Sequence, residues 1–323
     1  MKFGRQAIGL VLGLSGMLVS GVAQAGFDEA TAAYQQGNYG KAAQEFRTLA
    51  MQGDAHAQSN LGVMYVKGQG VARDFQEAAK WYRLAAVQGN AGAQSSLGTM
   101  YEDGRGVAQD YQEAAKWYTL AAAQGHAGAQ YNLGVLYNHG RGVAQDYQKA
   151  VKLYQLAAAQ GTAYAQHNLG VMYNNGHGVL QDYHEGSKWY RLAAAQGNAS
   201  AQFNLGAMYN NGHGVAQDYH EAVKWYRLAA AQGYAGAQAN LGLMYEYGQG
   251  VASNRVVAYA LFNLSAANDP SSSNKAISNR TNLMHLIKPE EIEAGQALTR
   301  ELSKPGNLLN ALDRYVKTVA RRS

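Results

Sequence analysis

The sequence contains no cysteine in 323 residues. Disulfide bonds are therefore excluded, and so is the lipid-modified cysteine by which an exported lipoprotein is anchored. Small exported domains often depend on disulfides for stability. This chain must instead be held together by side-chain packing.

Charge is also scarce, because Asp, Glu, Lys and Arg together make up 15% of the chain. The formal net charge is only +5, and no basic face stands out along the sequence. Proteins that bind nucleic acid present a clustered basic surface. We therefore expect no nucleic-acid partner.

Long hydrophobic runs are missing as well. An uncharged apolar stretch spans residues 7–22, whereas a membrane-spanning helix needs about 20 apolar residues. Lys2 and Arg5 precede this stretch, and Ala-Gln-Ala at 23–25 supplies the small residues that a signal peptidase requires. We interpret residues 1–25 as a cleaved signal peptide. The remaining chain is then expected in the periplasm of a Gram-negative bacterium, with no membrane span.

Proline is rare, at three residues, whereas glycine is abundant, at 38. The glycines recur at fixed intervals, so they mark turns rather than flexible linkers. Shifting the sequence against itself by 36 residues brings long runs into identity, which indicates a repeat architecture. Six units begin at Gly53, Gly89, Gly125, Gly161, Gly197 and Gly233, and the last ends at Asn268. Residues 26–52 are interpreted as a degenerate half-repeat, because residues 33–52 resemble the second half of a unit.

Each unit predicts two helices, of which the first spans residues 55–66 in the first unit. Ala57, Leu61 and Tyr65 are spaced four residues apart and therefore share one face. Two glycines that follow end the helix, since glycine adopts the left-handed conformation of a helix C-terminus without penalty.

The second helix of each unit starts at an acidic residue. In the first unit Asp74 can accept hydrogen bonds from the free amides of the first turn, and Glu77 is placed to complete a capping box. The same spacing recurs in three further units, at Asp110/Glu113, Asp182/Glu185 and Asp218/Glu221. An active site needs one acidic pair, whereas every helix needs a cap, so we interpret these residues as caps.

A Trp-Tyr pair recurs on the second helix of four units. Leucine replaces the tryptophan in the other two units, at Leu153 and Leu261. An aromatic residue that leucine can replace fills space in a core. The tryptophans, Trp81, Trp117, Trp189 and Trp225, are therefore expected to be structural.

The repeated pattern is Ala-x-x-x-Leu-Gly-x-Met-Tyr-x-x-Gly-x-Gly-Val-x-x-Asp-Tyr-x-x-Ala-x-x-Trp-Tyr-x-x-Ala-Ala-x-x-Gly. Over residues 53–268 it resembles the Sel1-like repeat, a relative of the tetratricopeptide repeat. The resemblance implies an all-α, right-handed α-solenoid of helix-turn-helix repeats whose first helices line a concave face. It also implies a role as an adaptor or scaffold for other proteins. Some exported relatives are immunity proteins against toxins from neighbouring bacteria, including lipase-type effectors, and a cysteine-rich branch is associated with penicillin binding.

Differences among the six units show which first-helix positions the fold leaves free. With the opening glycine as position 1, positions 9, 10 and 13 hold Leu, Gly and Tyr in every unit, whereas positions 4, 7, 11, 14 and 15 vary. The variable positions follow one helical stripe, which predicts an exposed face. Aromatic and amide side chains in the middle units are typical of a protein-binding hot spot, although drift among solvated side chains would also produce variation. The predicted contact residues are Tyr131, Tyr164, His167, Phe203, Asn138, His139, Asn174, Asn210 and Tyr247.

Nine histidines raise the question of a metal site. His177 and His213 share a loop position in adjacent units, and His184 and His220 share a second-helix position. Equivalent atoms of packed helices lie about 8–10 Å apart or more, whereas zinc-bound nitrogens lie about 2.0–2.1 Å from the ion. We therefore expect no metal, no cofactor and no catalytic residue.

The 36-residue period stops after Asn268. Residues 275–287, 290–302 and 308–319 read as helices, and we expect residues 269–323 to form a C-terminal helical cap over the apolar end of the solenoid. The favoured interpretation is a periplasmic adaptor, not an enzyme, that recognises a protein partner through its concave face. The alternatives are an immunity protein against a secreted effector such as a lipase, and a cell-wall-acting or penicillin-binding enzyme.

Overall fold

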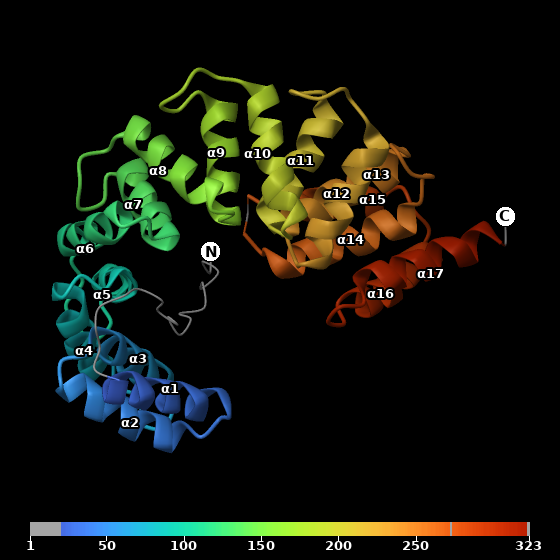
Figure 1. The fold of residues 1–323 in the computed structure, drawn as a ribbon. Coiled ribbons are helices and arrows are strands. Elements are labelled where there is room, and N and C mark those ends of the chain that lie inside the picture. The colour runs from blue at the N-terminus through green and yellow to red at the C-terminus, as the bar shows by residue number, and fades with distance from the viewer. Residues whose placement is uncertain (1–20, 272, 322–323) are drawn as a thin grey trace. The chain divides into compact units, whose positions relative to one another are not determined.

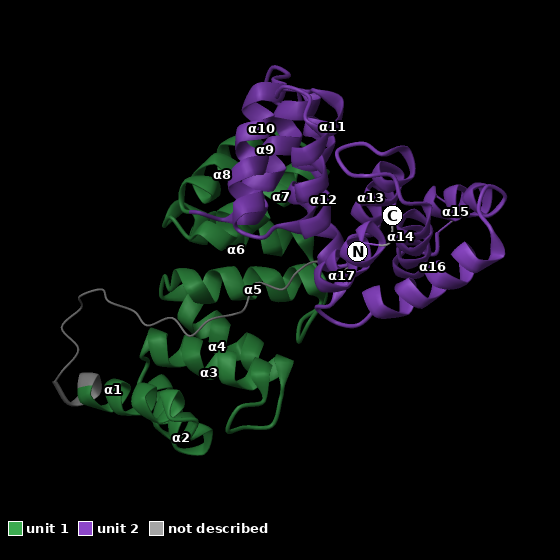
Figure 2. Cartoon of the chain, turned by 90° about the vertical axis from the view of Figure 1, so that its right-hand side faces the viewer, with its two compact units in different colours: residues 1–160 green, residues 161–323 purple. Residues whose placement is uncertain are grey.

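The computed structural model describes residues 21–271 and 273–321, and these residues form seventeen helices and no strand (Figure 1). The chain divides into two compact units, residues 1–160 and 161–323 (Figure 2). Within each unit successive helices pack as antiparallel hairpins, each hairpin against the next. The predicted all-α fold of tandem helix-turn-helix repeats is confirmed. Residues 1–20, which carry most of the signal-peptide interpretation, lie outside the described residues.

The described residues of unit 1 form eight helices. They are α1 (Gly21–Gln35), α2 (Tyr39–Met51), α3 (Ala55–Lys67), α4 (Phe75–Val87), α5 (Ala91–Asp103), α6 (Tyr111–Ala123), α7 (Ala127–His139) and α8 (Tyr147–Ala159). Helices α3, α5 and α7 are first helices of repeats, and α4, α6 and α8 are second helices.

Unit 2 contains three further repeats and three terminal helices. The repeat helices are α9 (Ala163–Asn175), α10 (Tyr183–Ala195), α11 (Ala199–Asn211), α12 (Tyr219–Ala231), α13 (Ala235–Tyr247) and α14 (Arg255–Asn268). The terminal helices are α15 (Ala276–Met284), α16 (Pro289–Leu302) and α17 (Leu308–Ala320).

The glycine at position 10 lies inside each first helix because a large ring occupies its side-chain space. A Cβ atom added to Gly98 would lie 2.7 Å from ring carbons of Tyr118. Gly206 and Tyr226 are related in the same way. The tyrosine at position 30 therefore packs directly on the helix backbone, and Tyr118 is fully buried. The pairing explains why neither residue varies within the first five repeats.

The tryptophans are less buried than the sequence predicts. Each is half-buried, and the tyrosine that follows it occupies the buried place instead. Trp117 packs against the cluster that contains Leu97 and Met100, so it does contribute to packing. Consecutive residues of an α-helix are rotated by about 100° about the helix axis. Because position 30 points into the core, position 29 lies at its edge.

The acidic caps form, but the predicted capping box does not. Asp110 accepts hydrogen bonds from the backbone amides of Gln112 and Glu113, at 2.9 and 3.0 Å. Its own amide donates to the carbonyl of Tyr101, which leaves no donor for the Glu113 carboxylate. Glu113 instead pairs with Lys116 at 2.5 Å. The equivalent bond to the tyrosine carbonyl closes the loop in every repeat, with the amide of Asn254 as the donor in the last one.

A glutamine at position 6 joins neighbouring hairpins in a way that the sequence analysis missed. Gln94 is buried, donates to the carbonyl of Ala86, and accepts from Gln124 at 2.8 Å. Gln202 repeats these contacts with Ala194 and Gln232 in unit 2. The side-chain amide thus satisfies carbonyl groups that helix ends leave without a partner.

The segment before the first repeat contains two helices, of which the sequence predicted only the second, α2. Ala30 and Ala33 of α1 are buried against Phe46 of α2, and Phe27 and Tyr34 pack on the same cluster. These four residues are spaced three, three and one apart, which is a helical pattern.

The C-terminal helices cover the last repeat. Helix α14 packs against α15 and α16. Its buried residues, including Tyr259, Leu261 and Leu264, surround the helix. A helix that is apolar on all sides must be covered by protein, and Leu298 and Leu302 of α16 belong to the same cluster.

Candidate protein-binding face

The first-helix face of each unit comprises positions 4, 7, 14 and 15 of the first helices in that unit. In unit 1 the predicted contact residues on it are Tyr131, Asn138 and His139 of α7. Tyr131 is half-buried, with its ring centroid 6.0 Å from that of Tyr154. His139 is exposed, and the Asn138 amide lies 3.4 Å from its ring nitrogen Nε2. Partial burial and the nearby Arg141 guanidinium lower the pKa of His139.

The side chains at position 7 are more buried than the variability of this position predicts. The small residues found there, Ser59, Ser95 and Ala239, are at most 9% exposed. In unit 2 the position-7 rings of His167 and Phe203 lie 5.7 and 5.9 Å from the rings of Tyr190 and Tyr226. These rings therefore contribute to packing as well as to the surface.

His167 bridges α9 and α11 as a neutral ring. Its Nε2 lies 3.2 Å from the amide nitrogen of Asn204, and its Nδ1 lies 3.1 Å from the side-chain oxygen of Asn168. An imidazole that carries its proton on Nδ1 satisfies both contacts. Burial lowers the pKa of His167, which favours this neutral form.

Phe203 continues the face toward α13. Its ring centroid lies 4.9 Å from that of Tyr234, the residue that precedes α13. A Cβ atom on Gly236 would come within 3.3 Å of the Phe203 ring, so the glycine at this position 4 gives the ring room.

Two asparagine pairs end the neighbouring helices α9 and α11. Asn174 donates to Asn175 at 3.2 Å, and Asn210 donates to Asn211 at 2.9 Å. The position-15 members are exposed, and the position-14 members are half-buried. Among the described residues, the amide nitrogen of each position-15 member and the side-chain oxygen of each position-14 member form no hydrogen bond. Each pair therefore offers a donor and an acceptor to a peptide backbone.

Tyr164 and Tyr247 are the most exposed of the predicted contact residues in unit 2. Tyr164 lies near the start of α9 and is 38% exposed, and Tyr247 ends α13 and is 67% exposed. By contrast, Leu133, Leu169 and Leu205 at position 9 are buried, as the sequence predicts. The sequence analysis missed Asn204 and Tyr234. It placed Asn175 and Asn211 at a variable position of the face but did not include them among the predicted contact residues.

Neither a metal cluster nor a membrane span is found in the described part of the chain. No group of three His, Cys, Asp or Glu side chains is arranged to hold a metal ion there. None of the helices over residues 21–321 is long and apolar enough to cross a bilayer. His213 stacks on Tyr183 at 5.2 Å, and His184 faces the carbonyl of Gly214 at 3.3 Å, so each has a local partner.

The family described as Sel1 repeat matches six consecutive segments, residues 55–90, 91–126, 127–162, 163–198, 199–234 and 235–270. A Sel1 repeat protein from Oxalobacter formigenes is similar, with 32% identity, a TM-score of 0.69, and coverage of 74% of this chain and 96% of its own.

Two further structures are more distant. The protective antigen c5321 of uropathogenic Escherichia coli has 26% identity, a TM-score of 0.50, and coverage of 92% of this chain and 87% of its own. The immunity protein Pa5087 of Pseudomonas aeruginosa has 22% identity, a TM-score of 0.42, and coverage of 66% and 82%. No curated relative matches the sequence. The six consecutive matches cover two-thirds of the chain, and the protein therefore belongs to the Sel1 repeat family.

Proposed function

We propose that the protein is a binding module that recognises a protein partner through the first-helix face. One observation carries this proposal: first helices of unit 2 expose tyrosines and paired asparagines at positions that the fold does not constrain. Tyr164 stands where three other units have glycine. Its exposure and that of Tyr247 fit the large, amphipathic anchors of protein-binding hot spots.

The chemistry of the face suits an extended segment of a partner. The unused amide groups of the pairs Asn174–Asn175 and Asn210–Asn211 can bind backbone carbonyl and amide groups, whereas the tyrosines contact side chains. Tandem helical repeats present such groups at regular intervals. Binding therefore requires no chemical step and no cofactor.

The site of action is proposed to be the periplasm. This part of the proposal rests on the charged start, apolar stretch and Ala-Gln-Ala site within residues 1–25. The buried residues of α1, Ala30 and Ala33, follow the expected cleavage site. Cleavage would thus retain the contacts that fix α1 on α2.

Capture from periplasmic extract tests the proposal. The wild-type chain is compared with the double variant Tyr164→Ser/Tyr247→Ser, and Leu180→Ser serves as a control because Leu180 is an exposed apolar residue on a loop outside this face. A partner that the wild type and the control retain and the double variant loses supports the proposal. Partners retained equally by all three proteins would contradict it.

The identity of the captured partner then decides between an adaptor and an immunity protein. If it is a secreted toxin such as a lipase, the purified chain should inhibit its activity, and the double variant should not. A partner without toxic activity assigns the adaptor role.

A further inference from the structure

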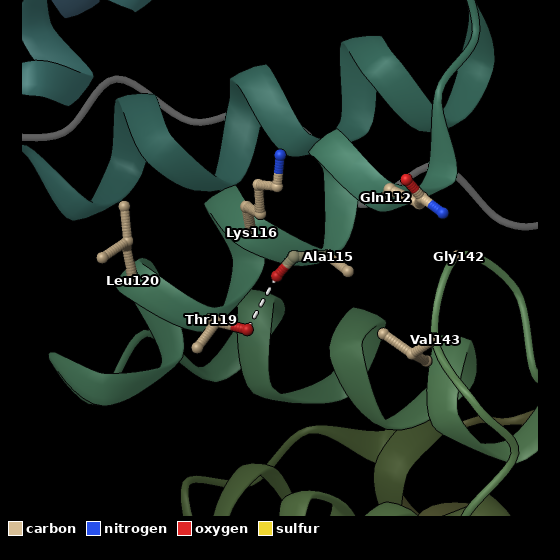
Figure 3. Close-up of a pocket in the computed structure, with 7 residues that line it drawn as sticks. All are labelled: Gln112, Ala115, Lys116, Thr119, Leu120, Gly142 and Val143. Atoms are coloured by element: carbon tan, nitrogen blue, oxygen red, sulfur yellow. Dashed lines mark hydrogen bonds between the residues drawn. The ribbon is translucent and has the colours of Figure 1, made fainter.

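A second surface, separate from the first-helix face, is formed by a groove that recurs along the repeats. Each copy lies between a second helix and the loop that follows the next first helix. In unit 1 an open copy of about 540 Å³ lies between α6 and the loop after α7 (Figure 3). In unit 2 an open copy of about 1130 Å³ lies between α10 and the loop after α11.

An unusual leucine lines these grooves. Leucine occupies position 32 in all six units, and Leu120 and Leu192 line the two open copies. Leu192 is 50% exposed, whereas its equivalent in the last repeat, Leu264, is 5% exposed beneath the terminal helices. The terminal helices thus bury this leucine in the last repeat, whereas it is exposed in the open copies.

The C-terminal helix α17 shows what covers the next copy of the groove, between α12 and the loop after α13. Helix α17 packs on α12, and Leu308 and Leu312 join the same apolar cluster as Tyr245. Asp313 accepts a hydrogen bond from the guanidinium of Arg227 at 2.5 Å. Tyr245 is only 3% exposed, whereas its equivalent Tyr209 in the open copy is half-buried.

The open copy in unit 2 has the same arginine and tyrosine as the copy that α17 covers, but it has no counterpart of Asp313. Arg191 is the equivalent of Arg227, and its guanidinium donates to the Tyr209 hydroxyl at 2.9 Å. No ion pair of Arg191 with a carboxylate is found over the described range. The one acid in the lining, Asp218, already caps α12, and Lys188 pairs with Glu185 at 2.9 Å. The groove therefore combines apolar walls with an unneutralised guanidinium.

We propose that the groove between α10 and the loop after α11 docks an amphipathic helix of a partner protein. The helix carries two apolar side chains four residues apart and a carboxylate beside them, as Leu308, Leu312 and Asp313 do in α17. The apolar pair packs against Tyr209 and beside Leu192, whose equivalent Leu228 is 37% exposed in the copy that α17 covers. The carboxylate pairs with Arg191. The copy beside α6 has Thr119 at the arginine position, and its hydroxyl donates to the carbonyl of Ala115 (Figure 3). That copy therefore lacks the charged half of the site, whereas Arg83 holds the position beside α4 and donates to the Tyr101 hydroxyl.

A synthetic peptide with the sequence of residues 307–320, labelled with a fluorophore, serves as the probe. Its binding to the full chain is measured by fluorescence anisotropy. We expect Arg191→Glu to weaken binding roughly tenfold or more, and a peptide with lysine in place of the aspartate to recover affinity for that variant. Leu192→Ser should weaken binding through the apolar contact, whereas Thr119→Glu, at the same repeat position in unit 1, should not.

Three outcomes would overturn the assignment. One is the absence of saturable binding to the wild type. Another is binding that is unaffected by Arg191→Glu but lost in Arg227→Glu, since the peptide would then exchange with α17 in its own groove. The third is a concentration-dependent dimer, detected by sedimentation, that Arg191→Glu abolishes, because a second copy of the chain would then be the occupant.

Discussion

Tyr118 packs on α5 at the point where Gly98 has no side chain. Equivalent Gly–Tyr pairs occur in the other repeats of both units, with Phe262 as the ring in the last repeat. Glycine inside a helix costs about 1 kcal/mol relative to alanine, so the fold accepts a local penalty in each first helix. The gain is the complete burial of a large ring, which stabilises the contact between the two helices of a hairpin.

Gly98→Ala should therefore destabilise the protein, because the new methyl group would lie 2.7 Å from the Tyr118 ring. Overpacking of this kind costs roughly 1–3 kcal/mol. Gly40→Ala is the matched control, since Gly40 lies in α2 with no atom within 4 Å of the added methyl, and it should stabilise by up to about 1 kcal/mol. Urea denaturation measures both changes, and equal effects of the two substitutions would contradict the close contact.

His167 should make stability depend on pH. Burial lowers its pKa in the folded chain, whereas the unfolded histidine has a pKa near 6.5. Below about pH 6.5 the unfolded state binds more protons, so the free energy of unfolding falls by at most about 1.4 kcal/mol per pH unit for this residue. The fall stops once the pH is below the folded pKa.

His167→Phe removes this titration. The new side chain is the one that the next repeat already has at position 7, Phe203. Urea denaturation of the wild type and the variant between pH 7.5 and about pH 5 should give a steeper decline for the wild type. Parallel curves would mean that His167 titrates normally in the folded protein.

Helix α6 illustrates how a whole element is specified. Asp110 caps its first turn, the Asp110 amide closes the preceding loop on Tyr101, and glycine in the left-handed conformation ends the helix before it, at Gly104. These boundaries were predictable because the same residues recur at the same spacing in each unit. The role of Glu113 was not predictable from spacing alone, since the loop geometry decides which acceptor the Asp110 amide meets.

Asp110→Ala should cost about 1 kcal/mol, because two amides of the first turn lose their acceptor. Glu113→Ala should cost only about 0.2–0.5 kcal/mol, because it removes an exposed ion pair with Lys116. A true capping box would make the two losses similar. Guanidinium denaturation of both variants distinguishes these cases.

At the scale of the whole molecule, the architecture was more predictable than the binding face. Residues repeated six times were enough to predict the 36-residue period, the ends of the repeat helices and the buried position-9 leucines. The burial of position 7 depends on the ring that the second helix places beside it, as Tyr190 lies beside His167. Variation at one position therefore could not separate an exposed side chain from one that packs in several ways.

Export should leave a chain that begins at Gly26. Small residues at 23 and 25 define the expected cleavage site. Amino-terminal sequencing of protein recovered from the periplasm checks this, with lysine in place of Ala25 as the uncleavable control. An intact Met1 in the wild-type protein would contradict the signal peptide.

The central claim is that a protein partner binds the first-helix face. The most direct test is hydrogen–deuterium exchange of the chain, measured alone and in complex with the partner that the chain captures from periplasmic extract. We expect slower amide exchange at the residues of α9, α11 and α13 that carry Tyr164, the two asparagine pairs and Tyr247. Slower exchange confined to α10, α12 or the C-terminal helices, with the first helices unchanged, would contradict it.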